Sequence, residues 1–136
     1  MFTKNLSLAI AFPCVVLAAA ANAQTYECEF KDGHRRNVIP PQVIVQVAAD
    51  GASAQVIDSL GHYHKIAPVP ATFVKDTTQR LRVRWTLKDL ISSAGQKATL
   101  NFSLTYQKAK GKAFVNMDIP GYGNTETGSG SCAIAK

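Results

Sequence analysis

The chain has 136 residues, with 15 lysines and arginines against 9 aspartates and glutamates, and a net charge of +6. This length suits one domain with one modest hydrophobic core and excludes two domains or a deep cleft between subdomains. The basic excess mildly favours anionic partners, but it is too small to indicate nucleic-acid binding, so no nucleic acid is expected as a partner.

The first 23 residues have the three parts of a removable signal peptide. Lys4 supplies positive charge, residues 6–21 are almost entirely apolar, and Ala21-Asn22-Ala23 is an A-x-A cleavage site. A membrane anchor is the alternative, but an apolar run interrupted by Pro13 is short for a span that needs about 20 residues. We therefore expect an exported protein, periplasmic or secreted, with a single β domain over residues 24–136 and no transmembrane segment in the mature chain.

Two of the three cysteines, Cys28 and Cys132, remain after this cleavage. A pair of cysteines in an oxidising compartment most simply forms a disulfide. The bond closes a loop of roughly 105 residues, which stabilises the fold by about 4–5 kcal/mol in the chain-entropy model. The alternative is two free thiols or a reactive Cys132, but neither residue has a C-x-x-C motif or an obvious base beside it.

Alternation of apolar and polar residues with a period of two predicts β-strands along most of the chain. Asp50-Gly51 is a typical hairpin turn, because glycine tolerates the positive φ that such turns need. No segment shows sustained helical periodicity, residues 88–97 are predicted to form a loop or one helical turn, and a short strand is an option at His62–Ile66. The other expected strands cover residues 25–30, 42–49, 54–59, 72–75, 79–87, 99–107, 113–119 and 125–134.

These segments predict an all-β fold, a single small antiparallel barrel or sandwich of about seven to eight strands. The predicted disulfide joins the first strand to the last, so residues 25–30 are expected beside residues 125–134. Such a clasp closes or nearly closes the sheet and protects its edges.

His62-Tyr63-His64 has the one metal-like spacing in the sequence. Residues two apart in a strand point the same way, so both imidazoles can bind one Zn²⁺ or Cu²⁺. A site needs a third ligand, for which His34 and Asp58 are candidates by composition alone. Histidines in such a loop are more often solvated, so we expect no cofactor and keep a periplasmic metal-binding protein as an alternative function.

Arg80, Arg82 and Arg84 form a basic stripe on the predicted strand 79–87. Alternate residues of a strand lie roughly 6.6 Å apart, which is close to phosphate spacing. The stripe is also what the solvated side of an amphipathic strand looks like, and no aromatic residue interleaves with the arginines, which argues against a base-stacking groove. The three arginines are the candidate contact for an unidentified partner, either an acidic protein or an anionic envelope polymer.

Motifs for catalysis are missing from the sequence. There is no G-x-S-x-G, and the run Gly128–Ser131 lacks the following helix that a nucleophile elbow requires. Glu27 and Glu29 lie side by side on one strand, whereas glycoside hydrolysis needs two carboxylates across a cleft. We interpret the lysines at the hairpin tip, residues 108–112, as solubilising. The sequence predicts a non-enzymatic protein that binds a partner or belongs to the cell envelope.

The chain resembles a family of short uncharacterised exported bacterial β-proteins. The resemblance is carried by the start Tyr26-x-Cys28 and by four later segments: Arg80–Trp85, Leu104–Tyr106, Gly121–Asn124 and the terminal Gly128–Cys132. It implies a fold and an exported location, and no reaction.

A looser similarity is to periplasmic inhibitors of c-type lysozyme, small barrels that also begin with a Tyr-x-Cys strand. Residues 50–55 lack the serine-containing motif of their inhibitory loop, and a positive chain does not suit a basic lysozyme. The shared Tyr-x-Cys start nevertheless keeps a lysozyme-inhibitor-like protein as a further alternative function.

Overall fold

The computed structural model describes residues 23–32, 38–123 and 125–135, so the predicted signal peptide lies almost wholly outside the described residues. The fold is all-β, as predicted, but its sheet has nine antiparallel strands, and the expected number of seven to eight is wrong. In chain order the elements are β1 (Gln24–Asp32), β2 (Gln42–Val47), β3 (Ala54–Asp58), α1 (Ser59–Tyr63), β4 (Val69–Pro70), β5 (Phe73–Asp76), β6 (Arg80–Ile91), β7 (Lys97–Gln107), β8 (Lys112–Asp118) and β9 (Thr125–Ile134).

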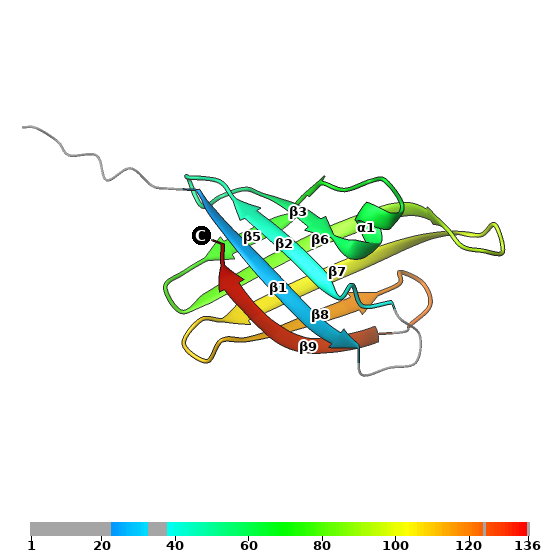
Figure 1. The fold of residues 1–136 in the computed structure, drawn as a ribbon. Coiled ribbons are helices and arrows are strands. Elements are labelled where there is room, and N and C mark those ends of the chain that lie inside the picture. The colour runs from blue at the N-terminus through cyan, green and yellow to red at the C-terminus, as the bar shows by residue number, and fades with distance from the viewer. Residues whose placement is uncertain (1–22, 33–37, 124, 136) are drawn as a thin grey trace, which may run out of the picture.

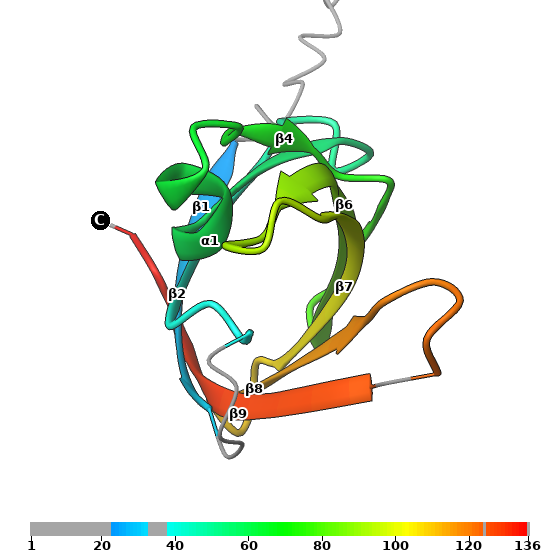
Figure 2. The ribbon, with the colours of Figure 1, turned by 90° about the vertical axis from the view of Figure 1, so that its right-hand side faces the viewer.

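The sheet curls until its two ends meet (Figure 1, Figure 2). Its strand order is β4-β3-β2-β1-β9-β8-β7-β6-β5, so the two end strands are consecutive in the chain and are joined by Ala71 and Thr72. The Ala71 N–H donates to the Ala54 carbonyl on β3, and the Thr72 N–H donates to the Arg84 carbonyl on β6. One short segment thus changes partner from β3 to β6. The two end strands have only 2 and 4 residues, and short edge strands offer little for pairing with another chain.

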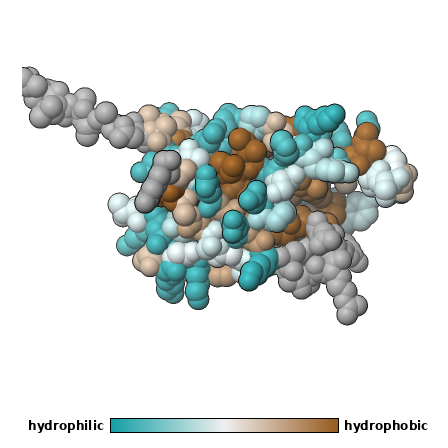
Figure 3. Space-filling model, in the orientation of Figure 1, coloured by the Kyte–Doolittle hydropathy of each residue, from teal (hydrophilic) through white to brown (hydrophobic). Residues whose placement is uncertain are grey.

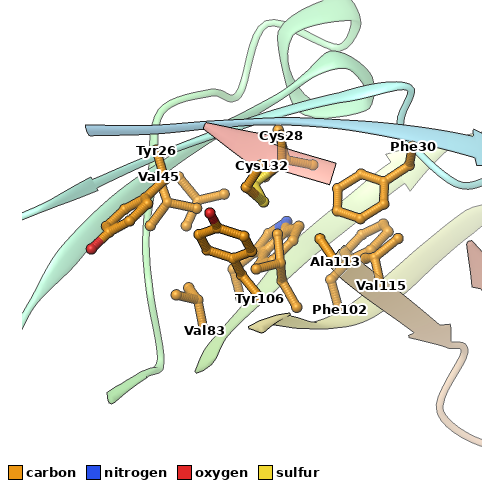
Figure 4. Close-up of a cluster of buried hydrophobic side chains, with 14 of the residues drawn as sticks. Tyr26, Cys28, Phe30, Val45, Val83, Phe102, Tyr106, Ala113, Val115 and Cys132 are labelled. Atoms are coloured by element: carbon orange, nitrogen blue, oxygen red, sulfur yellow. A yellow bond between two sulfur atoms is a disulfide. The ribbon is translucent and has the colours of Figure 1, made fainter. Parts of the chain in front are cut away.

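The first and last strands pair directly, as predicted. Cys28 lies opposite Cys132 in the β1–β9 register, with their Cα atoms 4.0 Å apart, and the two residues form a disulfide. Both cysteines are buried, and the bond lies against the aromatic core (Figure 4). The disulfide therefore secures the one pairing in the sheet that joins the two ends of the domain.

Alternate residues of every long strand point into the curl and fill it. On β6 these include Leu81, Val83 and Trp85, while the arginines between them face outward. The Trp85 ring stacks on Phe102 of β7 with 5.1 Å between ring centroids. Burying one such side chain contributes about 1.5–3 kcal/mol, so this interior is the main source of stability.

Residues 59–63 form the short helix α1 at one end of the curl, and the strand expected at His62–Ile66 is wrong (Figure 2). Asp58 caps the helix by accepting a hydrogen bond from the Gly61 N–H at 2.6 Å. Aspartate is among the best N-cap residues, and a single turn is too short to show helical periodicity in the sequence. Leu60 packs against the core and Gly61 is buried, which attaches the helix to the sheet.

The loop expected at residues 88–97 is shorter than predicted, because β6 continues to Ile91 and β7 begins at Lys97, so that only residues 92–96 form the turn of a long hairpin. The register shifts between Leu87 and Leu90, and Asp89 adopts a φ of 58° there. This bulge adds an unpaired residue, so the simple alternation breaks in the sequence although the pairing resumes. Leu90 still points inward and is buried.

Candidate functional site

The outer surface of β5, β6 and the β7–β8 hairpin carries five basic side chains, which we call the basic face. Four of them line a hollow of about 510 Å³ together with Thr77, Gln79 and Gln107, and the fifth, Arg84, follows on β6. Antiparallel pairing places Lys75 directly opposite Arg82. Like charges at directly opposite positions destabilise a sheet, so this pairing indicates a role outside folding. The members of the basic face are Lys75, Arg80, Arg82, Arg84 and Lys110.

Carboxylates do not neutralise the basic face within the described part of the chain. The one ion pair between described residues joins Lys108 to Asp76. Asp76 belongs to β5, but it turns inward toward Tyr26, away from the arginines. The guanidinium groups of Arg80, Arg82 and Arg84 therefore remain available to an external anion, and arginine is well suited to bind carboxylates and phosphates through two hydrogen bonds.

An aromatic ring lies among the arginines, which the sequence did not lead us to expect. Phe73 of β5 pairs with Arg84 across the strands and has 39% of its surface exposed. The Arg84 and Arg82 guanidinium carbons lie 5.3 Å and 5.9 Å from the centre of its ring. Attraction between cation and ring holds both side chains over the sheet. The prediction failed because it considered one strand, whereas the ring comes from the neighbouring strand.

Lys75 and Phe73 could have been found from the sequence. Residues 72–75 and 79–87 were both expected as strands with a turn between them, and a hairpin pairs the positions on either side of such a turn. The structure shows this hairpin, with Asp76 opposite Leu81 and Lys75 opposite Arg82. Treating the two strands as a pair would therefore have placed both residues beside the arginines.

Lys108 does not belong to the basic face, although it lies on the same hairpin as Lys110. Its ammonium donates to Asp76 and to the Thr77 carbonyl and lies 5.3 Å from the centre of the Tyr26 ring. The Tyr26 hydroxyl donates to the same carboxylate, with 2.9 Å between the oxygens. This network ties the β7–β8 hairpin to β5 and so holds Lys110 at the edge of the hollow.

The network also shifts the acidity of two of its members. Burial raises the pKa of the Tyr26 hydroxyl, with Lys108 opposing the shift and Asp76 adding to it. Partial burial acts to lower the pKa of Lys108, but hydrogen bonds and charge from Asp76 and Tyr26 outweigh it and raise that pKa. Lys108 thus stays protonated and keeps its contact with Asp76.

Asp58 is a buried carboxyl beneath α1, with 1% of its surface exposed. It accepts hydrogen bonds from the indole N–H of Trp85 at 2.9 Å and from the Gly61 N–H. Burial raises its pKa above 3.8, while these hydrogen bonds and one from the Leu60 backbone oppose the shift. The residue positions the helix and the tryptophan, and it lies away from the basic face.

We expect the stability contributed by Asp58 to fall as the pH rises. Because its pKa in the folded state is raised, the folded chain binds this proton at a higher pH than the unfolded chain does. Relative to Asp58→Asn, the native chain should therefore lose unfolding free energy as the pH rises from about 4 to about 7. Urea unfolding followed by Trp85 fluorescence measures this. Asp118→Asn, which removes an exposed carboxylate, is the control, and the same pH trend in both comparisons would contradict the expectation.

The two histidines of the proposed metal site lie on and just after α1 instead of on a strand. His62 is in the last turn, and His64 is the C-cap. Residues two apart on a helix do not face each other, so the geometry that suggested a shared metal is lost. The described residues hold no group of three histidine, cysteine, aspartate or glutamate side chains able to bind a metal, and His34 lies outside them. Metal binding by His62 and His64 therefore stays a prediction, without support from the strand geometry that suggested it or from a third ligand among the described residues.

Comparison with known proteins does not assign this site. No protein-family model matches the sequence, and neither a curated protein nor a solved structure matches the chain. Among the residues that the structure describes, no helix is both long enough and apolar enough to cross a membrane. The two resemblances drawn from the sequence therefore stay predictions, and the basic face is the feature of the molecule that bears on function.

Proposed function

We propose that this protein is an exported, non-enzymatic binding protein and that its basic face holds an anionic polymer of the cell envelope. The observation that carries the proposal is the row of Arg80, Arg82 and Arg84, of which the first two line a hollow and none forms an ion pair with a described carboxylate, although Asp118 lines a neighbouring hollow with Arg84. A buried disulfide is compatible with export, because such bonds persist in oxidising compartments.

A polymer suits this surface better than a compact ligand does. The three guanidinium groups leave the same side of one strand, at intervals of roughly 6.6 Å, and Lys75 and Lys110 widen the positive field at one end. A chain with regularly repeated anionic groups can meet several of these cations at once. An acidic protein is the competing partner, and it would have to present carboxylates in a similar row.

The test compares two variants that each remove three positive charges. We expect Arg80→Gln, Arg82→Gln and Arg84→Gln together to weaken binding of hyaluronate or polyphosphate by about thirtyfold at low salt, because each exposed charge contact contributes up to about 1 kcal/mol. Lys65→Gln, Lys88→Gln and Lys97→Gln together are the matched control, since these exposed lysines lie outside the hollow.

Calorimetric titration at two salt concentrations measures both variants, and added salt should weaken binding. Equal losses in the two variants would show that only net charge matters and would refute the assignment to the basic face. Binding of polyglutamate alone would favour the acidic protein. If neither hyaluronate nor polyphosphate binds the native chain, the proposed function is wrong.

A further inference from the structure

A second hollow, of about 780 Å³, lies on the outer surface of β1, β9 and β8. Its polar lining combines a carboxylate, two ammonium groups, an amide and hydroxyl groups, and Phe114 lies among them with 38% of its surface exposed. Hydrophilic side chains cover most of the molecular face that shows β1 and β9, around an apolar patch over β2 and β3 (Figure 3). The lining residues used below are Glu29, Lys31, Gln42, Lys112, Phe114, Ser129 and Ser131.

The strand register connects this hollow to the basic face. Lys112 lines the second hollow, and its partner across β7 and β8 is Gln107, which lines the basic hollow. Following the register in both directions gives an unbroken line of outward polar side chains, one from each of six neighbouring strands. We call it the polar row: Gln42, Glu29, Ser131, Lys112, Gln107 and Arg80.

The polar row is long enough for an extended oligomer. Neighbouring strands lie about 4.8 Å apart, so the five steps from Gln42 to Arg80 cover about 24 Å along the curved surface. Only its Arg80 end is strongly basic. The part over β1 and β9 offers hydrogen-bond donors and acceptors with one carboxylate, Glu29, and one ammonium, Lys31.

This part of the polar row has the chemistry that recognises sugars. A sugar ring has hydroxyl groups around its edge and an apolar C–H surface on its faces. Serine hydroxyls and the Gln42 amide both donate and accept hydrogen bonds, and the Glu29 carboxylate accepts them from hydroxyl groups. The exposed Phe114 ring offers an apolar surface against which a sugar face can pack, with Ser129 as its register partner on β9. A small number of polar groups around an aromatic surface is typical of a ligand site.

A polyphosphate fits the same surface poorly. Its charge repeats at every unit, so over β1 it would meet Glu29 as well as Lys31 and Lys112, where the carboxylate offsets part of the attraction, and Phe114 would contribute nothing to its binding. A polysaccharide with charged and uncharged sugars avoids both costs, since an uncharged sugar can occupy the Glu29 hollow while an acidic sugar meets the arginines.

We infer that the second hollow is a saccharide subsite and that the ligand of the basic face is an anionic polysaccharide, which lies along the polar row and reaches the arginines of β6 at Arg80. This inference rests on the proposed function and names its ligand class. Its probe is hyaluronate, in which charged and uncharged sugars alternate, compared with polyphosphate at an equal concentration of negative charge.

The decisive variant is Phe114→Ala, with Ile91→Ala as control because Ile91 is an exposed apolar residue outside both hollows. We expect Phe114→Ala to weaken hyaluronate binding about tenfold and to change polyphosphate binding less than about twofold. Ile91→Ala should alter neither. Glu29→Ala should weaken hyaluronate binding and leave polyphosphate binding equal or tighter. Thermal unfolding of each variant confirms that it is folded.

The outcomes separate this inference from the proposed function. If both polymers bind through the arginines but Phe114→Ala affects them equally or not at all, the saccharide subsite is wrong. The proposal that the basic face binds an anionic polymer is then retained. The same holds if polyphosphate binds more tightly than hyaluronate. If neither polymer binds the native chain, the proposed function fails and the subsite fails with it.

Discussion

Reduction of the Cys28–Cys132 disulfide is expected to lower the free energy of unfolding by about 4 kcal/mol. The two cysteines are 104 positions apart, so the bond restrains almost the whole domain in its unfolded state. Small domains are commonly stable by about 5–15 kcal/mol, so the loss is a large share of the total. Trp85 is the single tryptophan and is buried, which makes its fluorescence a probe of the core in guanidinium unfolding.

Oxidised and reduced samples of the same chain provide the sharpest comparison, because the side chains are identical and only the covalent link differs. Cys28→Ala with Cys132→Ala is the second measurement, and it adds the loss of two buried sulfur atoms from the core. The β1–β9 pairing keeps its backbone hydrogen bonds in both cases, so we expect weaker but folded proteins. A decrease in the free energy of unfolding of less than about 1 kcal/mol on reduction would contradict a stabilising role of the disulfide.

Gly130→Ala is expected to destabilise the protein by about 3 kcal/mol or more. A Cβ atom built on Gly130 lies 1.7 Å from the Glu29 carbonyl oxygen and 2.9 Å from the Phe30 Cα. Both atoms belong to the backbone of β1, so relief requires the two strands to separate where they pair beside the disulfide. The close approach of β1 and β9 therefore depends on the missing side chain.

Gly128→Ala is the matched comparison, since it adds the same methyl group two residues earlier on the same strand. Its nearest neighbour is a methyl group of the buried Ile39 side chain at 2.6 Å, and its nearest backbone atom, the Lys31 carbonyl oxygen, is 3.3 Å away, so a side chain has to shift but the paired strands do not have to separate. We expect a smaller loss there and almost none for Ser129→Ala, which faces outward. Chemical unfolding of the three variants measures the ranking, and equal losses at the two glycines would contradict it.

Much of this fold could be predicted from the sequence because alternation records which face of a strand is buried. Leu81, Val83 and Trp85 had to point away from the arginines in any strand, whatever lay beside them. The pairing of the first and last strands followed from two cysteines in a chain that the sequence predicts to be exported. These inferences needed only local geometry or one covalent constraint, and the structure bears them out.

Other features depended on neighbours that are distant in the sequence. The helix α1 forms because Asp58 can be buried with Trp85 as its partner, a contact across 27 positions. The chain changes from β3 to β6 at Ala71 and Thr72 because the curled sheet brings both edges within hydrogen-bond reach. Neither feature has a periodic pattern in the sequence from which it could be predicted.

The candidate site shows the same division. Three of its arginines were evident from the sequence, since they share one face of one strand. Lys75 and Phe73 join them through a hairpin of two consecutive strands, which the sequence can suggest, whereas the polar row was assembled only by the register of six strands about 5 Å apart. The sequence by itself determined which side chains face outward. Which of them lie together was decided by the tertiary structure, because pairing between strands depends on the closure of the whole sheet.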